Sequence, residues 1–514
     1  MSKNLYGTPT DSTDAQERAL VDASCRIPVL LFIASSVFWL LVGTVFGLIA
    51  SIKLHNPHFL IELPRWFALY LDKFSPDGTV DFINAMLTFG RVRPAHLNIV
   101  AYGWASASAL GVAIWLMARL CRAPLRFPAL VTAAMVLWNI AIAIGTIAIL
   151  GGKSTSIEWL EFPSYVSLML FVSYALISIW GVNMFVHRKP GHVYVSQWYI
   201  MAALFWFPWL YGTANLLLIF APIQGSSQAI VNWWYGHNAL GLWFTPIGLA
   251  AAYYFIPKVI GRPVHSYYLS AFGFWALALF YSWNGGHHLI GGPLPAWLIT
   301  SSIVASLMMF VPVLVTAINH HMTMKGNFHM LHYSPTLRFV VFGAMSYTLA
   351  SLQGSSMAFR SWNSLTHFTH YTIGHSHLGL YAFFTMIMFG SIYYIVPRLT
   401  RREWPSITLI KIHFWGSAYG IILMVLVLSV GGVVQGWMMN NPQIPQNTFE
   451  NILKITNPYL FARSLSGALL MVAHIAFALN LTLILLGWGK KTGGPTLFNQ
   501  LEASEEAKPK ESTL

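Results

Sequence analysis

Long apolar segments constrain this chain more than any other feature of its sequence. Of its 514 residues, 56% are hydrophobic and only 9% are charged. About 20 consecutive apolar residues cross a bilayer as a helix, in which the backbone hydrogen bonds are made within the segment. The sequence predicts an all-α polytopic membrane protein with twelve transmembrane helices: Ile27–Ala50, His96–Leu120, Pro128–Leu150, Ser164–Val186, Val195–Phe220, Ala229–Phe255, Tyr267–Leu289, Trp297–Asn319, Phe339–Ala358, Tyr371–Val396, Leu409–Val434 and Ser466–Trp488.

The charged residues lie almost entirely between these segments. No predicted segment holds Asp or Glu, and the basic residues within them, Arg119 and Lys411, each stand near one end. With the N-terminus inside, 20 of the 29 Lys and Arg residues lie on the inner side, Arg119 and Lys411 included, and 9 lie on the outer side. Because positively charged segments stay in the cytoplasm, both termini are expected there. The net charge of +13 is then explained by the Lys and Arg residues that orient the chain in the membrane, so it does not indicate nucleic-acid binding.

The sequence predicts a single helical domain. It covers residues 27–489, after a polar cytoplasmic segment at residues 1–26 and before a polar cytoplasmic tail at residues 490–514. The first apolar run is a full span, so no cleavable signal peptide is predicted. The chain has two cysteines, Cys25 and Cys121. That number excludes a disulfide framework, an iron–sulfur site and a covalent c-type haem on this chain.

Several histidines stand within or beside the apolar segments, where polar groups are costly and usually functional. When the segments alternate in direction, six of these histidines come to the outer half of the membrane. The six are His96, His237, His287, His288, His375 and His377. Two further histidines, His413 and His474, stand alone in their segments and are expected to be hydrogen-bonded packing residues.

The spacing of His375 and His377 predicts two binding sites on one helix. Residues two apart on a helix point to nearly opposite faces. Imidazole is a common axial ligand of haem iron. If His377 and His96 hold one haem, its iron is six-coordinate and suited to electron transfer. If His375 holds a second haem alone, that iron keeps a position for a small gas.

The adjacent pair His287 and His288 predicts a metal site when it is joined by His237 from another segment. Three imidazoles suit copper, and also zinc and iron. The sequence alone leaves the choice of metal open, although zinc beside haem would add no redox chemistry.

Four motifs carry a resemblance to a known family. They are Arg91-Val-Arg-Pro-Ala-His96, Trp233-Trp-Tyr-Gly-His237-Asn, Tyr281-Ser-Trp-Asn-Gly-Gly-His287-His288 and Ile373-Gly-His375-Ser-His377. Together they resemble the haem–copper oxidase superfamily, and within it the catalytic subunit of cbb3-type (C-type) cytochrome c oxidases. The resemblance implies reduction of dioxygen to water, coupled to proton translocation, in a bacterial cytoplasmic (inner) membrane. Electrons would come from membrane-anchored cytochrome c subunits of the same complex.

The resemblance also assigns the ligands. It implies low-spin haem b on His96 and His377, high-spin haem b3 on His375, and a copper ion on His237, His287 and His288. The family's redox tyrosine stands, in other members, four residues after the first copper histidine, where this chain has Gly241. In the C-type it comes from the next segment and maps to Tyr281. On a continuous helix Tyr281 would share a face with His288 and lie about 10 Å deeper.

Proton delivery would need hydroxyl groups and water, since no predicted segment holds an acid. Tyr267, Ser270 and Tyr347 match the family's single inner channel. One departure concerns Gln353, where the family usually has a glutamate, because an amide cannot carry a titrating proton.

The loops at the outer side supply further candidates. Glu158 and Glu161 are plausible contact or ion-site residues, and Arg91 or Arg93 could pair with haem propionates. The long loop from Lys53 to Arg93 is expected to help cover the haem edges.

Two alternatives remain at this stage. A nitric oxide reductase of the same superfamily would use non-haem iron with a carboxylate beside the histidines, and this chain has no acid near Gly241 or Gln353. A non-redox proton-coupled transporter would usually keep a charged residue in the membrane. Both alternatives fit the residues less well than an oxidase does.

Overall fold

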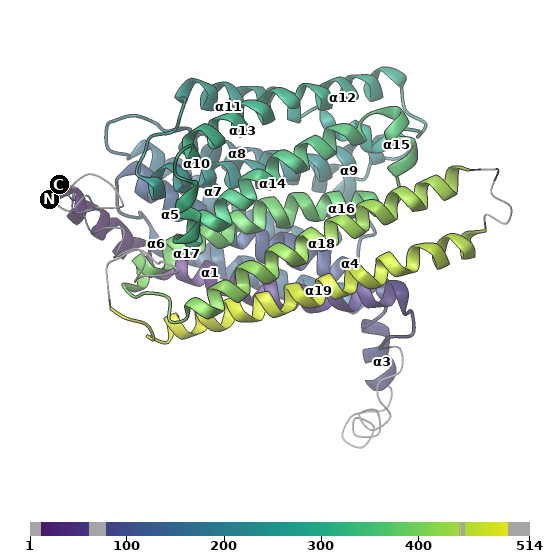
Figure 1. Ribbon diagram of the computed structural model, residues 1–514, viewed down its shortest axis with the longest axis horizontal. Coiled ribbons are helices and arrows are strands. Elements are labelled where there is room, and N and C mark those ends of the chain that lie inside the picture. Colours follow the sequence, from purple (N-terminus) through teal and green to yellow (C-terminus); the bar gives the residue numbers. More distant parts are fainter. Residues whose placement is uncertain (1–11, 61–78, 442, 444–447, 492–514) are drawn as a thin grey trace, which may run out of the picture.

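The computed structural model describes residues 12–60, 79–441, 443 and 448–491, and within this part of the chain it contains helices and no strand. The helices lie side by side, with their axes along the long dimension of the molecule (Figure 1). The helices are α1 (Ser12–His55), α3 (Thr79–Met86), α4 (Phe89–Asn98), η1 (Ile99–Ser106), α5 (Ala107–Cys121), α6 (Pro128–Leu150), α7 (Ser164–Val186), α8 (Val195–Asn215), η2 (Leu216–Phe220), α9 (Ser226–Ala239), η3 (Leu240–Phe244), α10 (Thr245–Ile260), α11 (Tyr267–Tyr281), η4 (Asn284–Leu289), α12 (Ala296–Met308), α13 (Phe310–Met324), η5 (Phe328–His332), α14 (Pro335–Met357), α15 (Arg360–Thr366), α16 (His370–His377), η6 (Leu378–Thr385), α17 (Met386–Thr400), α18 (Ile407–Asn440) and α19 (Phe449–Leu485).

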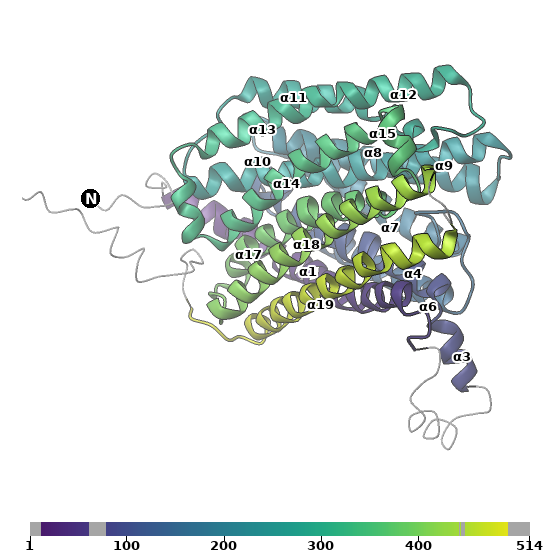
Figure 2. The ribbon, with the colours of Figure 1, turned by 45° about the vertical axis from the view of Figure 1, so that its right-hand side comes forward.

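The bundle has two ends, called the inner end and the outer end. The inner end is where α1 begins and α19 finishes, and the outer end is where α9 begins and α15 lies (Figures 1 and 2). The polar tail predicted at residues 490–514 lies largely outside the described residues, as does the middle of the predicted loop from Lys53 to Arg93. In the predicted N-terminal segment, helix α1 already begins at Ser12.

The described residues contain ten helical stretches that are long and apolar enough to cross a membrane, so the predicted number of twelve is not confirmed. Helix α11 falls short because it ends at Tyr281 after 15 residues, whereas the sequence analysis extends it to Leu289. Helix α14 has 23 residues but is not among the ten. The last helix starts at Phe449, well before the predicted Ser466.

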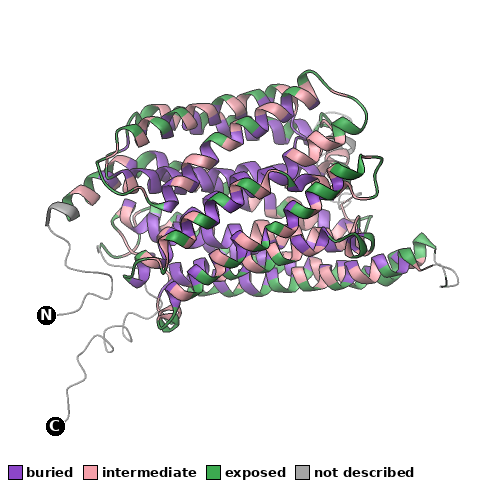
Figure 3. Ribbon diagram, turned by 90° about the horizontal axis from the view of Figure 1, so that it is seen from above, coloured by how far each residue is buried: buried purple, intermediate pink, exposed green. Residues whose placement is uncertain are grey.

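Three crossings form the centre of the bundle, and they carry four of the six histidines, His287 and His288 of η4 being the other two. The most apolar windows of Phe89–Cys121, Ser226–Ile260 and His370–Thr400 are 94%, 89% and 78% buried, against at most 56% in the other seven. A helix that is apolar on all sides lies in lipid or in a protein core, and the burial of these three places them in the core. In Figure 3 buried helical segments lie inside a layer of helices whose outer faces are exposed.

Each central crossing changes from α-helix to π-helix just after its histidines. The π-helical segments η1, η3 and η6 begin at Ile99, Leu240 and Leu378, within three residues of His96, His237 and His377. Such segments are rare and occur frequently at functional sites. The extra residue in a π-turn changes the direction of the side chains on either side of it. The periodicity of the sequence gave no sign of these segments.

Candidate functional site

A single cavity of about 520 Å³ is lined by all six histidines. The three central crossings form about half of its wall, and α1, η4, α14 and α19 are among the elements that form the rest. Binding cavities of this size are mostly apolar and carry a few well-placed polar groups. The structure thus brings together six residues that are spread over 282 positions of the sequence, from His96 to His377.

His237, His287 and His288 face one another at one part of this cavity. Each offers one ring nitrogen, and the three nitrogens lie within 4.8 Å of one another. The ring centroid of His237 is 4.8 Å from that of His287 and 5.3 Å from that of His288. Imidazole nitrogens in such a group suit copper, zinc or iron, so these residues could hold one transition-metal ion.

Helix α12 fixes the histidines of η4. The Ser302 hydroxyl accepts a hydrogen bond from the backbone N–H of His287 (2.8 Å) and donates one to the Asn284 carbonyl (2.5 Å). Nδ1 of His287 lies 2.8 Å from Oγ of Ser306. Hydrogen bonds to the second ring nitrogen usually set the orientation of a metal-binding histidine. The sequence analysis did not single out Ser302 or Ser306.

The prediction that Tyr281 and His288 share one face of a continuous helix is wrong. Helix α11 ends at Tyr281, and His288 belongs to the separate 3-10 helix η4. The reason lies in the two glycines between them. Glycine disfavours a continued α-helix, and Gly285 allows η4 to approach α9 so closely that a Cβ there would lie 2.6 Å from the Trp233 carbonyl oxygen.

Tyr281 lies beside His237 rather than far beneath the three histidines. The two rings are stacked, with centroids 4.7 Å apart and an angle of 29° between their planes. Tyr281 lines the cavity. The ring covers Gly241 so closely that a Cβ at this position would lie 1.7 Å from Cε1 of Tyr281. The missing side chain on η3 therefore makes the room that the tyrosine from α11 fills.

His96 and His377 are held in matching ways. Nδ1 of His96 lies 2.7 Å from the Gly43 carbonyl on α1, and Nδ1 of His377 lies 2.8 Å from the Ile373 carbonyl. In each case a proton on Nδ1 leaves Nε2 as the basic nitrogen that can bind a metal. The His96 ring rests on Gly47, where a Cβ would lie 2.6 Å from Cε1.

His375 is held by packing alone. Its ring rests on Gly354 of α14, where a Cβ would lie 2.9 Å from Cε1, and its buried Nδ1 has no hydrogen-bond partner in the described residues. The neighbouring Gln353 donates from Nε2 to Ser429 at 3.3 Å, while its buried Oε1 is also unpaired there. The amide thus orders α18 against α14, and it offers no carboxylate.

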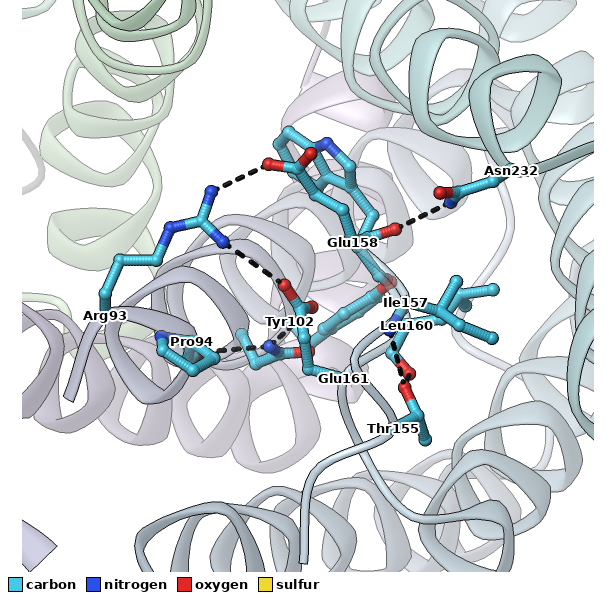
Figure 4. A network of polar contacts seen from close by, with 11 residues as sticks. Arg93, Pro94, Tyr102, Thr155, Ile157, Glu158, Leu160, Glu161 and Asn232 are labelled. Carbon is cyan, nitrogen blue, oxygen red and sulfur yellow. Dashed lines mark hydrogen bonds and ion pairs between the residues drawn. The ribbon is translucent and has the colours of Figure 1, made fainter. Parts of the chain in front are cut away.

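A network of polar contacts closes the outer end of the cavity (Figure 4). Arg93 lies 2.7 Å from a carboxylate oxygen of Glu158 and 3.8 Å from one of Glu161. Asn98 donates to Glu161 at 2.9 Å. Tyr102 donates to the Trp159 carbonyl at 2.6 Å, which fixes the same loop.

The carboxyl group of Glu161 is 3% exposed although it lies in a loop. Burial raises the pKa of Glu161 from 4.5 to about 7, and the Asn98 hydrogen bond and the charge of Arg93 reduce this rise. Desolvation disfavours the charged form of an acid, whereas a donor or cation favours it. Here desolvation has the larger effect, so Glu161 takes up or releases a proton near neutral pH.

Of the two arginines predicted as partners of haem propionates, Arg91 and Arg93, only Arg93 lines the cavity. Arg91 donates to the Leu150 carbonyl at 3.0 Å and is absent from the cavity wall, whereas Arg93 lines it. Arg463 of α19 also lines it, and its buried Nε has no hydrogen-bond partner in the described residues. The sequence analysis missed Arg463, which stands three residues before the predicted start of the last segment. The sequence signal that could have revealed Arg463 is a basic residue within a long, mostly apolar helix.

The predicted proton-path residues stand at separate points between the inner end and the cavity. Tyr267 donates to the Val193 carbonyl at 2.8 Å, and Ser270 accepts from Asn319 at 3.1 Å. The Tyr347 hydroxyl is buried without a partner in the described residues, and Tyr347 lines the cavity. No hydrogen bond among the described residues joins the three. Asn319 is an additional polar residue on this side.

Comparisons with known proteins give consistent similarities. A family model described as "Cytochrome C and Quinol oxidase polypeptide I" matches residues 27–469. The chain is 30% identical to "Cbb3-type cytochrome c oxidase subunit CcoN1" of Stutzerimonas stutzeri over 459 residues, which cover 87% of this chain and 92% of that protein. It is also 30% identical to "Cytochrome c oxidase subunit 1" of Rhodobacter capsulatus over 464 residues, with 87% and 83% covered.

A solved structure shares the fold. It is described as a "heme-copper terminal oxidase dimer", and it superposes with a TM-score of 0.66 over 93% of this chain and 86% of that one, at 14% identity. At that identity the likeness concerns the arrangement of the helices.

Proposed function

The chain belongs to the cytochrome c and quinol oxidase polypeptide I family, and from this premise we propose that it is the catalytic subunit of a cbb3-type terminal oxidase. It reduces dioxygen to water with electrons from cytochrome c, and it couples this reaction to proton translocation. The observation that carries the proposal is the single cavity in which a three-imidazole group and three further histidines meet.

The family binds haem and copper, and the residues in the cavity fit both. Two glycines, Gly47 and Gly354, leave room for the rings of His96 and His375. In our assignment His96 and His377 hold the low-spin haem b, and His375 holds the high-spin haem b3. The copper ion belongs to His237, His287 and His288. When bound, these groups supply the redox chemistry and the position for the gas.

Tyr281 supplies a proton to the reacting oxygen. Its ring is stacked on His237, so its hydroxyl belongs to the same part of the cavity as the three-imidazole group. A positioned acid of this kind adds on the order of 100-fold or more to a rate. The position of Tyr281 over Gly241 agrees with the C-type arrangement and gives the active site the phenol that η3 lacks.

Protons reach Tyr281 from the inner end through hydroxyl groups and water. Tyr267, Ser270 and Tyr347 are the proposed stations. Asn319 contacts Ser270. Tyr347 of α14 lines the cavity, and its hydroxyl has no partner in the described residues. A passage of this kind can work without a carboxylate, so Gln353 does not prevent proton delivery to the active site.

The multi-pass chain lies in the bacterial inner membrane with both termini in the cytoplasm. All twelve predicted segments cross it, including the two outside the ten long apolar stretches, which are the short α11 together with η4, and α14. The domain covers residues 27–489. Membrane-anchored cytochrome c subunits deliver electrons at the outer end, close to Arg93 and Arg463, which pair with haem propionates. Glu158 and Glu161 hold Arg93 and the loop in place.

The alternative of a nitric oxide reductase is not favoured. The residues that line the cavity include one acid, Glu158, and it pairs with Arg93 at the outer end instead of joining the three histidines. A non-redox transporter is disfavoured by the family itself.

The test is spectroscopy of the purified complex together with metal analysis. We expect two non-covalent haems and one copper per chain, one haem being low-spin and the other binding carbon monoxide. Oxygen consumption should exceed nitric oxide reduction. A preparation with iron in place of copper, or without haem, would overturn the assignment.

A further inference from the structure

His474 of α19 is a buried histidine with both ring nitrogens hydrogen-bonded, and it is outside the proposed ligand set. It is 2% exposed. Its Nδ1 lies 2.8 Å from Oγ1 of Thr44, and its Nε2 lies 2.7 Å from the Tyr381 hydroxyl. These partners come from α1 and η6, so three helices meet at one imidazole ring.

This group lies next to the site proposed for the low-spin haem. Tyr381 follows His377 by four residues on one continuous helix, about 6 Å closer to the inner end. Thr44 precedes Gly47, the glycine under the His96 ring, by three residues on α1. Thr44, Tyr381 and His474 all line the cavity that His96 and His377 line. The group therefore borders the His96–His377 site on its inner side.

The hydrogen bonds of the group can accommodate a protonated ring. The Thr44 hydroxyl has a second partner in the Leu40 carbonyl at 2.6 Å, and a carbonyl can only accept. The Tyr381 hydroxyl has a second partner in Ser417 at 3.1 Å. When both hydroxyls donate to these second partners, both can accept from the ring, and His474 can donate from both nitrogens as imidazolium.

The neutral ring also fits the same contacts. If the Ser417 hydroxyl turns to donate to Tyr381, then Tyr381 donates to Nε2 of His474, and Nδ1 alone carries a proton. The site thus holds either protonation state without moving a backbone atom. A histidine whose only role was to pack α19 against α1 would need only one of these two protonation states.

We propose that His474, held between Thr44 and Tyr381, is a proton-binding site coupled to electron transfer at the His96–His377 haem site. When one electron from the donor cytochrome arrives there, one proton from water binds to the His474 ring, and the proton leaves when the electron moves on. The N–H bond forms as an O–H bond of a hydronium ion in the water breaks, and the reverse exchange occurs when the electron leaves. The inference rests on the proposed function, since it needs a low-spin haem at this place.

Electrostatics supplies the coupling. An added electron makes a neighbouring positive charge more favourable, and the interaction is strong where water is excluded. The coupling is reciprocal, so protonation of His474 also favours the reduced haem. The titratable groups facing His474 are Tyr381 from η6 and His413 from α18, with Phe389 in ring contact with both histidines. On the third side α1 contributes the Thr44 hydroxyl.

The test measures the ratio of reduced to oxidised low-spin haem in the purified complex. The ambient potential is held constant, and pH is varied over the full range in which the complex stays intact. With one proton per electron, the ratio in the wild-type protein falls by up to tenfold per pH unit across the window in which His474 titrates. In His474→Gln and in Tyr381→Phe this dependence is weakened or moved to another pH.

Tyr393→Phe is the matched control. Tyr393 is also hydrogen-bonded to a buried histidine, His413, at 2.8 Å, but neither residue lines the cavity. This variant should keep the wild-type pH profile. Redox-difference infrared spectra with labelled histidine should show imidazole bands that disappear in His474→Gln.

The outcomes separate the inference from the proposed function. If the wild-type complex lacks a low-spin haem, both are wrong. If the haem spectrum is intact and both variants keep the wild-type pH profile, only the inference is wrong. If His474→Gln does not accumulate, Tyr381→Phe alone decides, because it keeps the aromatic ring and removes only the hydroxyl.

Discussion

Tyr281 and Gly241 fit together as side chain and empty space. A Cβ on Gly241 would lie 1.7 Å from Cε1 of Tyr281, a separation that no packed structure tolerates. The tyrosine comes from α11 and the glycine from η3, yet the ring is placed beside His237 as a residue of η3 would be. The position of the phenol, rather than the helix that carries it, is what the proposed chemistry requires.

Substitutions at this pair should separate chemistry from cofactor binding. Tyr281→Phe keeps the ring and removes the hydroxyl, so we expect oxygen consumption to fall on the order of 100-fold with haem and copper unchanged. Gly241→Ala should lower it similarly by displacing the ring. Gly90→Ala is the control, because nothing lies within 4 Å of a Cβ there. Wild-type turnover in Tyr281→Phe would contradict the assigned role.

Copper content should depend on both the histidines and the serine behind them. His237→Ala should remove copper and leave the low-spin haem in place. Ser306→Ala takes away the hydrogen bond to Nδ1 of His287 and should weaken copper binding about 10- to 100-fold. Ser301→Ala on the same helix, where the hydroxyl bonds only to the Leu298 carbonyl, is the control. Metal analysis after dialysis against a chelator measures each case, and full copper in His237→Ala would refute the site.

Substitutions at the two glycines under histidine rings should have opposite effects on the two haem signals. Gly47→Ala puts a methyl group 2.6 Å from the His96 ring, and Gly354→Ala puts one 2.9 Å from the His375 ring. We expect the first to lower the low-spin haem signal and to spare carbon monoxide binding. The second should do the reverse. Difference spectra per mole of protein measure both, and identical losses in the two variants would speak against separate haem sites.

The sequence predicts the kind of fold and the six histidines because both follow from short-range chemistry. A segment that crosses lipid must be an apolar helix, and a histidine inside such a helix usually has a function. The family resemblance drawn from four motifs is confirmed by the family model over residues 27–469. The regular 3.6-residue period, however, misplaced Tyr281 relative to His288, because the end of α11 at Tyr281 and the close contact of η4 with α9 are tertiary effects.

Other features were invisible for the same reason. The π-helical segments after His96, His237 and His377 depend on packing in the centre of the bundle. The burial of Glu161 depends on how the loop at residues 151–163 folds over Asn98. His474 looked like a packing residue until Thr44 and Tyr381, distant in sequence, were found at its two nitrogens.

Glu161 should make stability depend on pH. Burial raises its pKa from 4.5 in the unfolded chain to about 7 in the folded one. The stabilisation is complete below pH 4.5, where both states hold the proton, and it is lost as pH rises through about 7. The loss is on the order of 3 kcal/mol. Glu161→Gln should therefore flatten the decline in melting temperature over this window, whereas the control Glu158→Gln, at a carboxylate that is 39% exposed, should leave it unchanged. An equally steep decline in Glu161→Gln would show that another group titrates.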